Sequence, residues 1–205
     1  TLTFVQVPDD LPDTPEVIGP LAQGWFIAQQ GLVCSGQWGM IPPGSPTRRP
    51  VSPSTGRPLS TNNARSEELA AKASFKMPWA RGQRCIIPAE SFDEPCWETG
   101  KNVWWTFRRA NGAPWGLAGL WNTWVDRATG EVFECHTMAT VNADRHPIMG
   151  RMHKPDPKRP ADQQDKRSVV AIEAGDVDRW LAGALADAQA LLRAPEAQGL
   201  SPEPP

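Results

Sequence analysis

Short runs of apolar residues, bounded by residues that favour turns, dominate the middle of the chain. The four clearest runs are 85–88, 103–108, 115–121 and 132–140. Asn111-Gly112 and Thr129-Gly130 separate the later runs, and such pairs are typical of β-hairpin turns. Residues 25–27, 32–41 and 168–172 have the same apolar character. The pattern therefore predicts a mostly antiparallel β core.

Two segments carry a helical pattern. Residues 66–73 are rich in Ala and Glu and end before Pro78, which predicts one short helix. Residues 174–193 place apolar side chains at roughly helical spacing, which predicts one amphipathic helix. We therefore expect an α+β fold, with a single domain over residues 1–193 that has a barrel-like, mostly antiparallel β core and a few flanking helices. A disordered tail is expected at 194–205.

Composition narrows the class of protein. A chain of 205 residues, 40% hydrophobic and with ten tryptophans, can bury the core of one domain. No apolar run reaches the length of a membrane span or a signal-peptide core, so we expect a cytoplasmic protein without a membrane partner. The net charge of −2 argues against binding nucleic acid by bulk electrostatics. Residues 145–167 nevertheless hold seven Lys or Arg against three Asp, which is either a solvated surface or a local basic patch.

Glu94 is the first candidate for chemistry. It follows Phe92-Asp93 and precedes Pro95, which predicts that it ends a strand where the backbone changes direction. A carboxylate at such a position is either an ordinary turn former or a general acid/base. The second role requires neighbouring apolar side chains to exclude water and raise the pKa of the carboxyl.

Two further groups of polar residues are candidates. Asn63 and Arg65 lie just before the first predicted helix. Asparagine there is either an N-cap or a hydrogen-bond partner of a reacting group, and the arginine is either exposed to solvent or bound to a phosphate. His153 lies between Arg151-Met152 and Lys154, a setting that suits an anionic ligand, although a single histidine is more often structural.

A zinc site is the alternative that could be built from the cysteines. The four residues that could supply its ligands are Cys85, Cys96, Cys135 and His136. Their spacing contains no CxxC or HxxxH pair, and cysteines in apolar strands are usually core residues. We therefore expect neither a metal ion nor a cofactor.

Five ordered motifs resemble the SOS response-associated peptidase family. They are QWGMIP (37–42), NNAR (62–65), RCIIPAESFDE (84–94), GLAGLW (116–121) and RMHKP (151–155). The resemblance runs from about residue 36 to residue 181 and implies a small, mostly β, monomeric protein with a cleft for single-stranded DNA. It also implies covalent cross-linking to abasic sites, in the context of DNA damage, by a cysteine that follows the initiator methionine. Autocatalytic removal of the methionine exposes that cysteine.

The chemistry that the resemblance implies joins the N-terminal residue to the abasic sugar. The deoxyribose opens to an aldehyde, the α-amine condenses with it to a Schiff base, and the thiol then closes a thiazolidine ring. Mapped by motif, Asn63 would hydrogen-bond the terminal residue or the linkage, and Glu94 would be the acid/base. His153 would complete the set, with His146 as the alternative, since Asp165 stands where the family's usual motif has a histidine.

The resemblance also implies DNA contacts. Arg65, Arg151 and Arg167 would contact phosphates, and Trp38 would shape the cleft wall. Two aromatic residues of the family's signature around Glu94 are absent from this chain, so stacking on bases should be weaker there.

The start of the chain departs from the family. Its first residue is Thr1 and no Met-Cys precedes the first motif, so we expect that the nucleophile-bearing segment is missing from this chain. Thr1 could supply an α-amine but lacks the thiol that ring closure needs. Two alternatives to a cross-linking sensor therefore stay open: a non-catalytic module that binds single-stranded DNA, and a peptidase that acts on other proteins.

Overall fold

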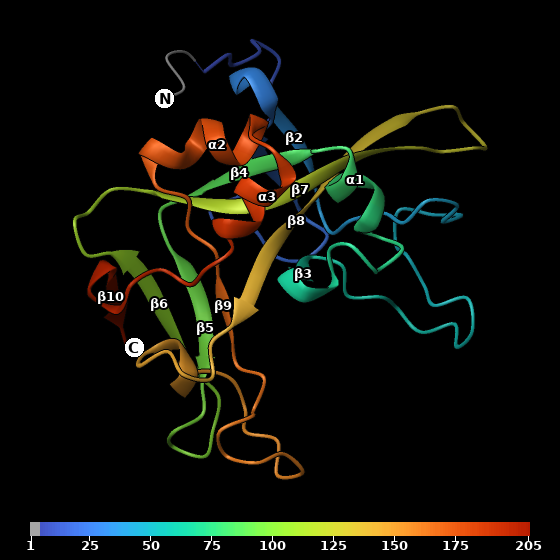
Figure 1. The fold of residues 1–205 in the computed structure, drawn as a ribbon. Helices are drawn as coiled ribbons and strands as arrows, with labels where there is room; N and C mark the ends of the chain where they lie inside the picture. Colours follow the sequence, from blue (N-terminus) through green and yellow to red (C-terminus); the bar gives the residue numbers. More distant parts are fainter. Residues whose placement is uncertain (1–4) are drawn as a thin grey trace.

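A five-stranded barrel forms the centre of residues 5–205, the part of the chain that the computed structural model describes (Figure 1). Its strands are β1 (Gln23–Ile27), β2 (Val33–Trp38), β4 (Arg84–Ala89), β7 (Trp115–Val125) and β8 (Val132–Asn142). Neighbours in the order β2, β1, β4, β7, β8 pair antiparallel, and β8 closes the barrel by pairing parallel to β2. The expected α+β fold with a barrel-like, mostly antiparallel core is confirmed. Thr1 lies outside the described residues.

Two short strands extend the sheet at the C-terminal end of β8. Strand β3 (Asn63–Arg65) runs parallel to β8, and β9 (Arg167–Val169) runs antiparallel to its last residues. The pairing of β8 with β7 ends at Met138, so the remaining residues of β8 are free to pair with β9. Strands from distant parts of the sequence therefore meet at this end of the barrel.

A second, smaller sheet packs beside the barrel. It has the order β10, β6, β5, formed by β5 (Phe92–Cys96), β6 (Val103–Arg109) and β10 (Leu200–Glu203). Asn111-Gly112 leads from β6 into the barrel strand β7, which belongs to the other sheet, so the hairpin predicted at this turn is wrong. Thr129-Gly130 does lie in a hairpin, the one that joins β7 to β8. In place of the tail expected at 194–205, β10 pairs with β6 along its length and Leu200 is buried.

The helices differ from the predicted ones. The α-helices are α1 (Lys76–Ala80), α2 (Val177–Ala182) and α3 (Leu185–Ala190), and 3₁₀ turns lie at Gln29–Gly31, Ser66–Glu68, Met149–Arg151, Ala174–Asp176 and Ala197–Gly199. The predicted helix at 66–73 is only a 3₁₀ turn and irregular turns. Helix α1 contains Pro78 in its first turn, where the missing N–H of proline is not needed. The predicted helix at 174–193 is interrupted at Gly183, whose backbone is extended.

Two of the three hydrophobic clusters in the described residues account for this arrangement. The larger one fills the space between the barrel and the helices, with side chains such as Trp79, Leu120 and Trp180. The second unites the two sheets, with Phe107 from β6 and Met138 from β8. In Figure 1, α2 and α3 cover the upper end of the barrel, and the small sheet lies below. The second cluster positions the candidate site, because the strands that carry the candidate residues converge on it.

The cysteines do not form a metal site. All four are free thiols, and Cys85, Cys96 and Cys135 lie in three different hydrophobic clusters, so they cannot bind one zinc ion together. Within residues 5–205, no group of three or more His, Cys, Asp or Glu side chains is placed to hold a metal ion. No helix in the described part of the chain has the length and apolar character needed to cross a membrane.

Candidate active site

Glu94 lies inside a strand, and its carboxyl is buried. Its Cα partner is Trp105 in β6, so the predicted position at the end of a strand is wrong. Side chains alternate between the faces of a strand, which places Glu94 on the face of Phe92 and Cys96, both part of the cluster between the sheets. Only 13% of the Glu94 side chain is exposed. Burial, reinforced by the negative charge of Asp93, raises the pKa of Glu94 to about 8.

His153 approaches this carboxyl from the loop that leads into β9. Its Nε2 is buried and lies 3.2 Å from Oε2 of Glu94, but it is not aligned for a hydrogen bond with any described residue. Its backbone N–H donates to the Pro95 carbonyl at 2.6 Å, and Met152 forms a β-bridge with Cys96. The backbone of His153 is left-handed, with φ of 61°, a conformation that a non-glycine residue keeps where surrounding contacts hold it.

The pKa shifts favour uncharged partners at neutral pH. Burial lowers the pKa of His153 below its usual 6.5; a hydrogen bond to the backbone of Arg167 opposes this shift, and the charges of Lys166 and Arg167 add to it. Burial lets Glu94, whose pKa is about 8, keep its proton at pH 7. At pH 7 the Glu94 carboxyl therefore keeps its proton, and the neutral imidazole of His153 beside it can accept a further proton. Titratable groups whose surroundings push their pKa values apart in this way can serve as the acid and the base of general acid/base catalysis.

Asn63 and Arg65 leave the same face of β3. They are two residues apart in the strand and both are exposed, whereas Ala64 between them is fully buried. Trp38 braces this strand, because its indole N–H donates to the Asn62 carbonyl at 2.8 Å. The Asn63 side chain is exposed, and its amide has no hydrogen-bond partner among the described side chains, so it is free to bind a ligand.

Arg65 and Arg167 share a carboxylate partner. Arg65 Nη2 lies 2.8 Å from the Asp165 carboxylate, and Arg167 Nη1 lies 3.2 Å from it. Arg167 also donates to both carboxylate oxygens of Glu67, at 2.6 and 3.1 Å. These pairs join β9 to β3, and the backbone contact of Arg167 joins both strands to the His153 imidazole.

Arg151 has its own carboxylate partner. It donates two hydrogen bonds to Glu98, at 2.7 and 2.8 Å, and its guanidinium lies over the Trp105 ring, 5.4 Å from the centroid. Each arginine that the sequence predicts as a phosphate contact is therefore already bound to a protein carboxylate. A phosphate at any of these positions has to compete with that carboxylate for the guanidinium.

The surroundings of the other two histidines favour a structural role for each of them. His146 accepts two backbone N–H groups at Nδ1 and uses Nε2 to bond a backbone carbonyl. His136 is buried, and burial lowers its pKa to about 4. The structure brings His153, and not His146, to Glu94.

Lys166 is a residue of this region that sequence reasoning missed. It is only 6% exposed, and its ammonium donates to the carbonyls of Met152 and His153, at 2.6 Å each. In the sequence it is one of seven basic residues in 145–167, and no local pattern distinguishes it from an exposed neighbour such as Lys158. Its burial depends on the fold of the whole loop, which the sequence pattern does not show.

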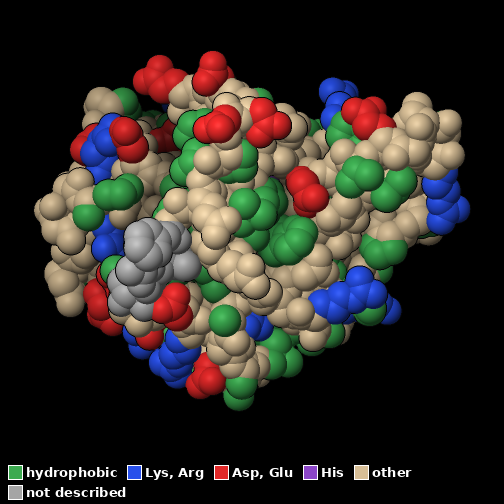
Figure 2. All heavy atoms as spheres, turned by 90° about the horizontal axis from the view of Figure 1, so that it is seen from above, with side chains coloured by type: hydrophobic (Ala, Val, Ile, Leu, Met, Phe, Trp, Pro, Cys, Tyr) green, Lys and Arg blue, Asp and Glu red, His purple; other side chains and the backbone are tan. Residues whose placement is uncertain are grey.

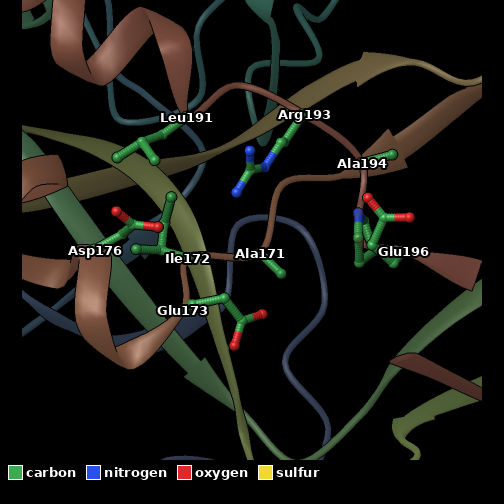
Figure 3. A pocket seen from close by; sticks show the side chains of 9 residues that line it. Ala171, Ile172, Glu173, Asp176, Leu191, Arg193, Ala194 and Glu196 are labelled. Carbon is green, nitrogen blue, oxygen red and sulfur yellow. The ribbon is translucent and has the colours of Figure 1, made fainter. Parts of the chain in front are cut away.

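A small cavity lies away from these residues (Figure 3). It has a volume of about 90 Å³ and is lined by two segments, 171–176 after β9 and 191–196 after α3. Two of its carboxylates are already paired, Glu173 with Arg109 and Asp176 with Arg179. The face seen in Figure 2, from above the helices, mixes acidic, basic and hydrophobic side chains. Neither feature gathers the convergent polar groups found around Glu94.

Comparison with known proteins finds relatives over most of the chain. Residues 20–204 match the sequence model of a family described as SOS response associated peptidase (SRAP). The chain is similar to a solved protein from Bordetella bronchiseptica, with 34% identity, a TM-score of 0.83, and coverage of 98% of this chain and 90% of that chain. A protein from Bacteroides thetaiotaomicron has 20% identity, a TM-score of 0.71 and coverage of 90% and 74%. A phage-related protein from Bordetella bronchiseptica has 19% identity, a TM-score of 0.58 and coverage of 92% and 80%. These last two share the fold.

Proposed function

The chain belongs to the SOS response associated peptidase family, and we propose that it recognises abasic sites in single-stranded DNA and processes them with the acid/base pair Glu94 and His153. The observation that carries the proposal is the 3.2 Å approach of His153 Nε2 to the buried carboxyl of Glu94. Membership of the family supports a role in handling damaged DNA. Such a substrate places the proposed activity in the cytoplasm, at the nucleoid.

The proposed reaction begins with opening of the abasic sugar. The ring oxygen takes a proton from Glu94 and the 1′-hydroxyl gives one to His153, so the pair becomes a carboxylate and an imidazolium. A terminal α-amine then attacks the aldehyde carbon. The hydroxyl of the resulting carbinolamine takes the proton of His153 and leaves as water, which gives a protonated Schiff base. A thiol on the same terminal residue loses its proton to Glu94, adds to that carbon and closes a neutral thiazolidine.

The surrounding residues have binding roles in this proposal. The free amide of Asn63 hydrogen-bonds the terminal residue or the linkage. Arg65, Arg151 and Arg167 bind phosphates once DNA has displaced their carboxylate partners, and Trp38 forms part of the cleft wall.

The test compares this chain with a form extended at its N-terminus to begin with Met-Cys. Each is incubated with single-stranded DNA that carries one abasic site and is resolved on a denaturing gel. We expect a covalent product from the extended form, and we expect Glu94→Gln in that form to slow its appearance by roughly 10²–10⁴-fold, the usual contribution of a general acid/base. Glu90→Gln is the matched control, because the Glu90 side chain is 87% exposed and only four residues away.

Three other results would redirect the proposal. Reaction of Glu94→Gln at the parent's rate would refute the acid/base role. Reversible, salt-sensitive DNA binding by the extended form without any covalent product would describe a non-catalytic binding module. Cleavage of unrelated peptides by the extended form would point to a general peptidase.

A further inference from the structure

Lys166 is a buried lysine whose side-chain hydrogen bonds both go to the segment that carries His153. We propose that Lys166 is a positioning residue: its ammonium fixes the backbone of Met152 and His153 so that the imidazole meets the Glu94 carboxyl. The role in catalysis rests on the function proposed above for Glu94 and His153, whereas the geometry that Lys166 imposes can be tested without DNA.

The contacts of the ammonium are specific to this segment. It donates to two successive carbonyls, those of Met152 and His153, at 2.6 Å each. Hydrogen bonds from a charged donor are shorter and stronger than bonds between neutral groups. Lysine is rarely buried unless its charge is compensated, and removal of Lys166 would leave both carbonyls without this partner. The ammonium therefore acts as a clamp on two consecutive peptide groups.

Strand β5 holds the same segment from the other side. The His153 N–H donates to the Pro95 carbonyl, and Met152 bridges to Cys96. Because Glu94 directly precedes Pro95, these contacts fix the segment against the strand that carries the carboxyl. A left-handed non-glycine residue such as His153 is strained and persists only where surrounding contacts hold it. Without the clamp, the backbone of His153 can relax and carry the ring away from Glu94.

Lys166 is itself held in place by Asp144. The Asp144 carboxylate accepts the backbone N–H groups of Asp165 and Lys166, at 3.1 and 2.8 Å, and the side-chain amide of Asn142 at 3.0 Å. These bonds fix the backbone at the entry to β9, which directs the Lys166 side chain toward the loop that carries His153. A series of contacts thus leads from Asp144 through Lys166 to the imidazole.

The charges around the imidazole provide a readout of the clamp. Glu94 faces His153 from β5, Lys166 faces it from the residue before β9, and the backbone and side chain of Arg167 face it from β9. The positive charges of Lys166 and Arg167 and the burial of the ring both lower the pKa of His153. Loss of the Lys166 charge and release of the ring to solvent both raise this pKa, whereas loss of the hydrogen bond to the Arg167 backbone lowers it. Burial is the largest of these influences, so a net rise is expected.

The experiment measures the His153 pKa by NMR of labelled histidine rings in the chain as it stands, with His153→Gln used to assign the signal. Lys166→Met removes the clamp, and Lys166→Gln removes its charge while keeping an amide donor. Lys166→Arg keeps the charge and several donors. Lys158→Met is the matched control, an exposed lysine of the same loop. The same four variants are made in the form that begins with Met-Cys, and their rates of cross-linking to abasic DNA are compared.

We expect Lys166→Met to raise the His153 pKa and to slow cross-linking by roughly 10–100-fold, the size of effect that a displacement of about 1 Å produces. Lys166→Arg should restore part of both, and Lys158→Met should change neither. If Lys166→Met does not fold, Lys166→Gln carries the same expectation. A folded Lys166→Met or Lys166→Gln whose His153 pKa and rate equal those of the parent overturns the proposal. Absence of cross-linking in every form, the parent included, refutes the proposed function, while the pKa comparison still decides the role of Lys166.

Discussion

The proton held by Glu94 is a consequence of burial, and it makes stability depend on pH. The unfolded chain releases this proton near pH 4.5 and the folded protein releases it near pH 8. A raised carboxyl pKa contributes stability that is complete below pH 4.5 and is lost as the pH rises to about 8. His153 has the opposite sign, because its lowered pKa reduces stability only as the pH falls below 6.5. Of these two residues, only Glu94 makes the free energy of unfolding depend on pH between pH 6.5 and pH 8.

The first prediction concerns Glu94→Gln, which removes this titration. Between the unfolded and folded pKa values of Glu94, each rise of one pH unit lowers the free energy of unfolding by about 1.4 kcal/mol. Between pH 6.5 and pH 8 we therefore expect the free energy of unfolding of the parent to fall by about 2 kcal/mol relative to that of the variant. Urea denaturation at several pH values measures the difference. Glu90→Gln should keep the slope of the parent, because its carboxylate is exposed. Parallel curves for the parent and Glu94→Gln would mean that Glu94 is already ionised at pH 6.5.

Local sequence patterns predict the strands of the barrel. They do not predict elements that form only by pairing with distant segments of the chain. Apolar runs located the barrel strands β4, β7 and β8, because each run ends in residues that favour turns. Pro95 predicts the end of a strand, yet β5 continues through it. Strand β5 is at the edge of its sheet, where a proline without an N–H is tolerated. The position of Glu94 inside a strand follows from pairing with β6 and could not be inferred from residues 84–94 alone.

The C-terminal strand is a second example of an element that distant pairing creates. Residues 194–205 have no apolar period and contain several prolines, which is typical of a tail. Leu200 is nevertheless 5% exposed and packs into the cluster between the sheets, while β10 pairs with β6. One buried leucine and the edge of β6 are enough to order a segment whose own sequence carries little structural signal.

The second prediction tests this element. Leu200→Ala should lower the free energy of unfolding by about 2–5 kcal/mol, the range for a buried leucine replaced by alanine. Leu185→Ala in α3 is the control, because Leu185 is exposed, and it should stay within about 0.5 kcal/mol of the parent. Urea denaturation followed by tryptophan fluorescence measures both. Equal stabilities for the two variants would show that β10 contributes little to the fold.

At the scale of the whole molecule, the candidate site lies where the two sheets meet. Glu94 comes from the small sheet, Asn63 and Arg65 from the strand beside β8, and His153 from the loop between them. The sequence places these residues far apart, and each was as consistent with a turn, a cap or a structural histidine as with a site. Only the order of several motifs suggested that they belong together. The approach of His153 to Glu94 accompanies the packing of Met138, Met152 and Phe107 between the sheets, which local patterns do not report.

The net charge of −2 shapes how such a molecule can bind a polyanion. Bulk attraction is absent, so binding depends on local cations, and Arg65 and Arg167 are both held by Asp165. A phosphate must therefore compete with this carboxylate, and any exchange of one for the other reduces the net gain from each contact. Asp165 has a left-handed backbone, with φ of 59°, which asparagine also adopts readily. Asp165→Asn thus removes the competing charge without straining the loop.

The third prediction follows from this exchange. Asp165→Asn should bind a single-stranded oligonucleotide roughly three- to tenfold more tightly than the parent. The gain corresponds to about 1 kcal/mol of binding free energy, because the carboxylate no longer competes with phosphate for the arginines. Fluorescence anisotropy at fixed salt concentration measures the affinity. Asp162→Asn makes the same change of charge in the same loop at an exposed residue for which the described structure shows no ion pair, so it separates local exchange from a general gain in positive charge. Weaker binding by Asp165→Asn would show instead that the carboxylate orients the arginines for DNA, and the pairs seen here would then be part of the binding surface itself.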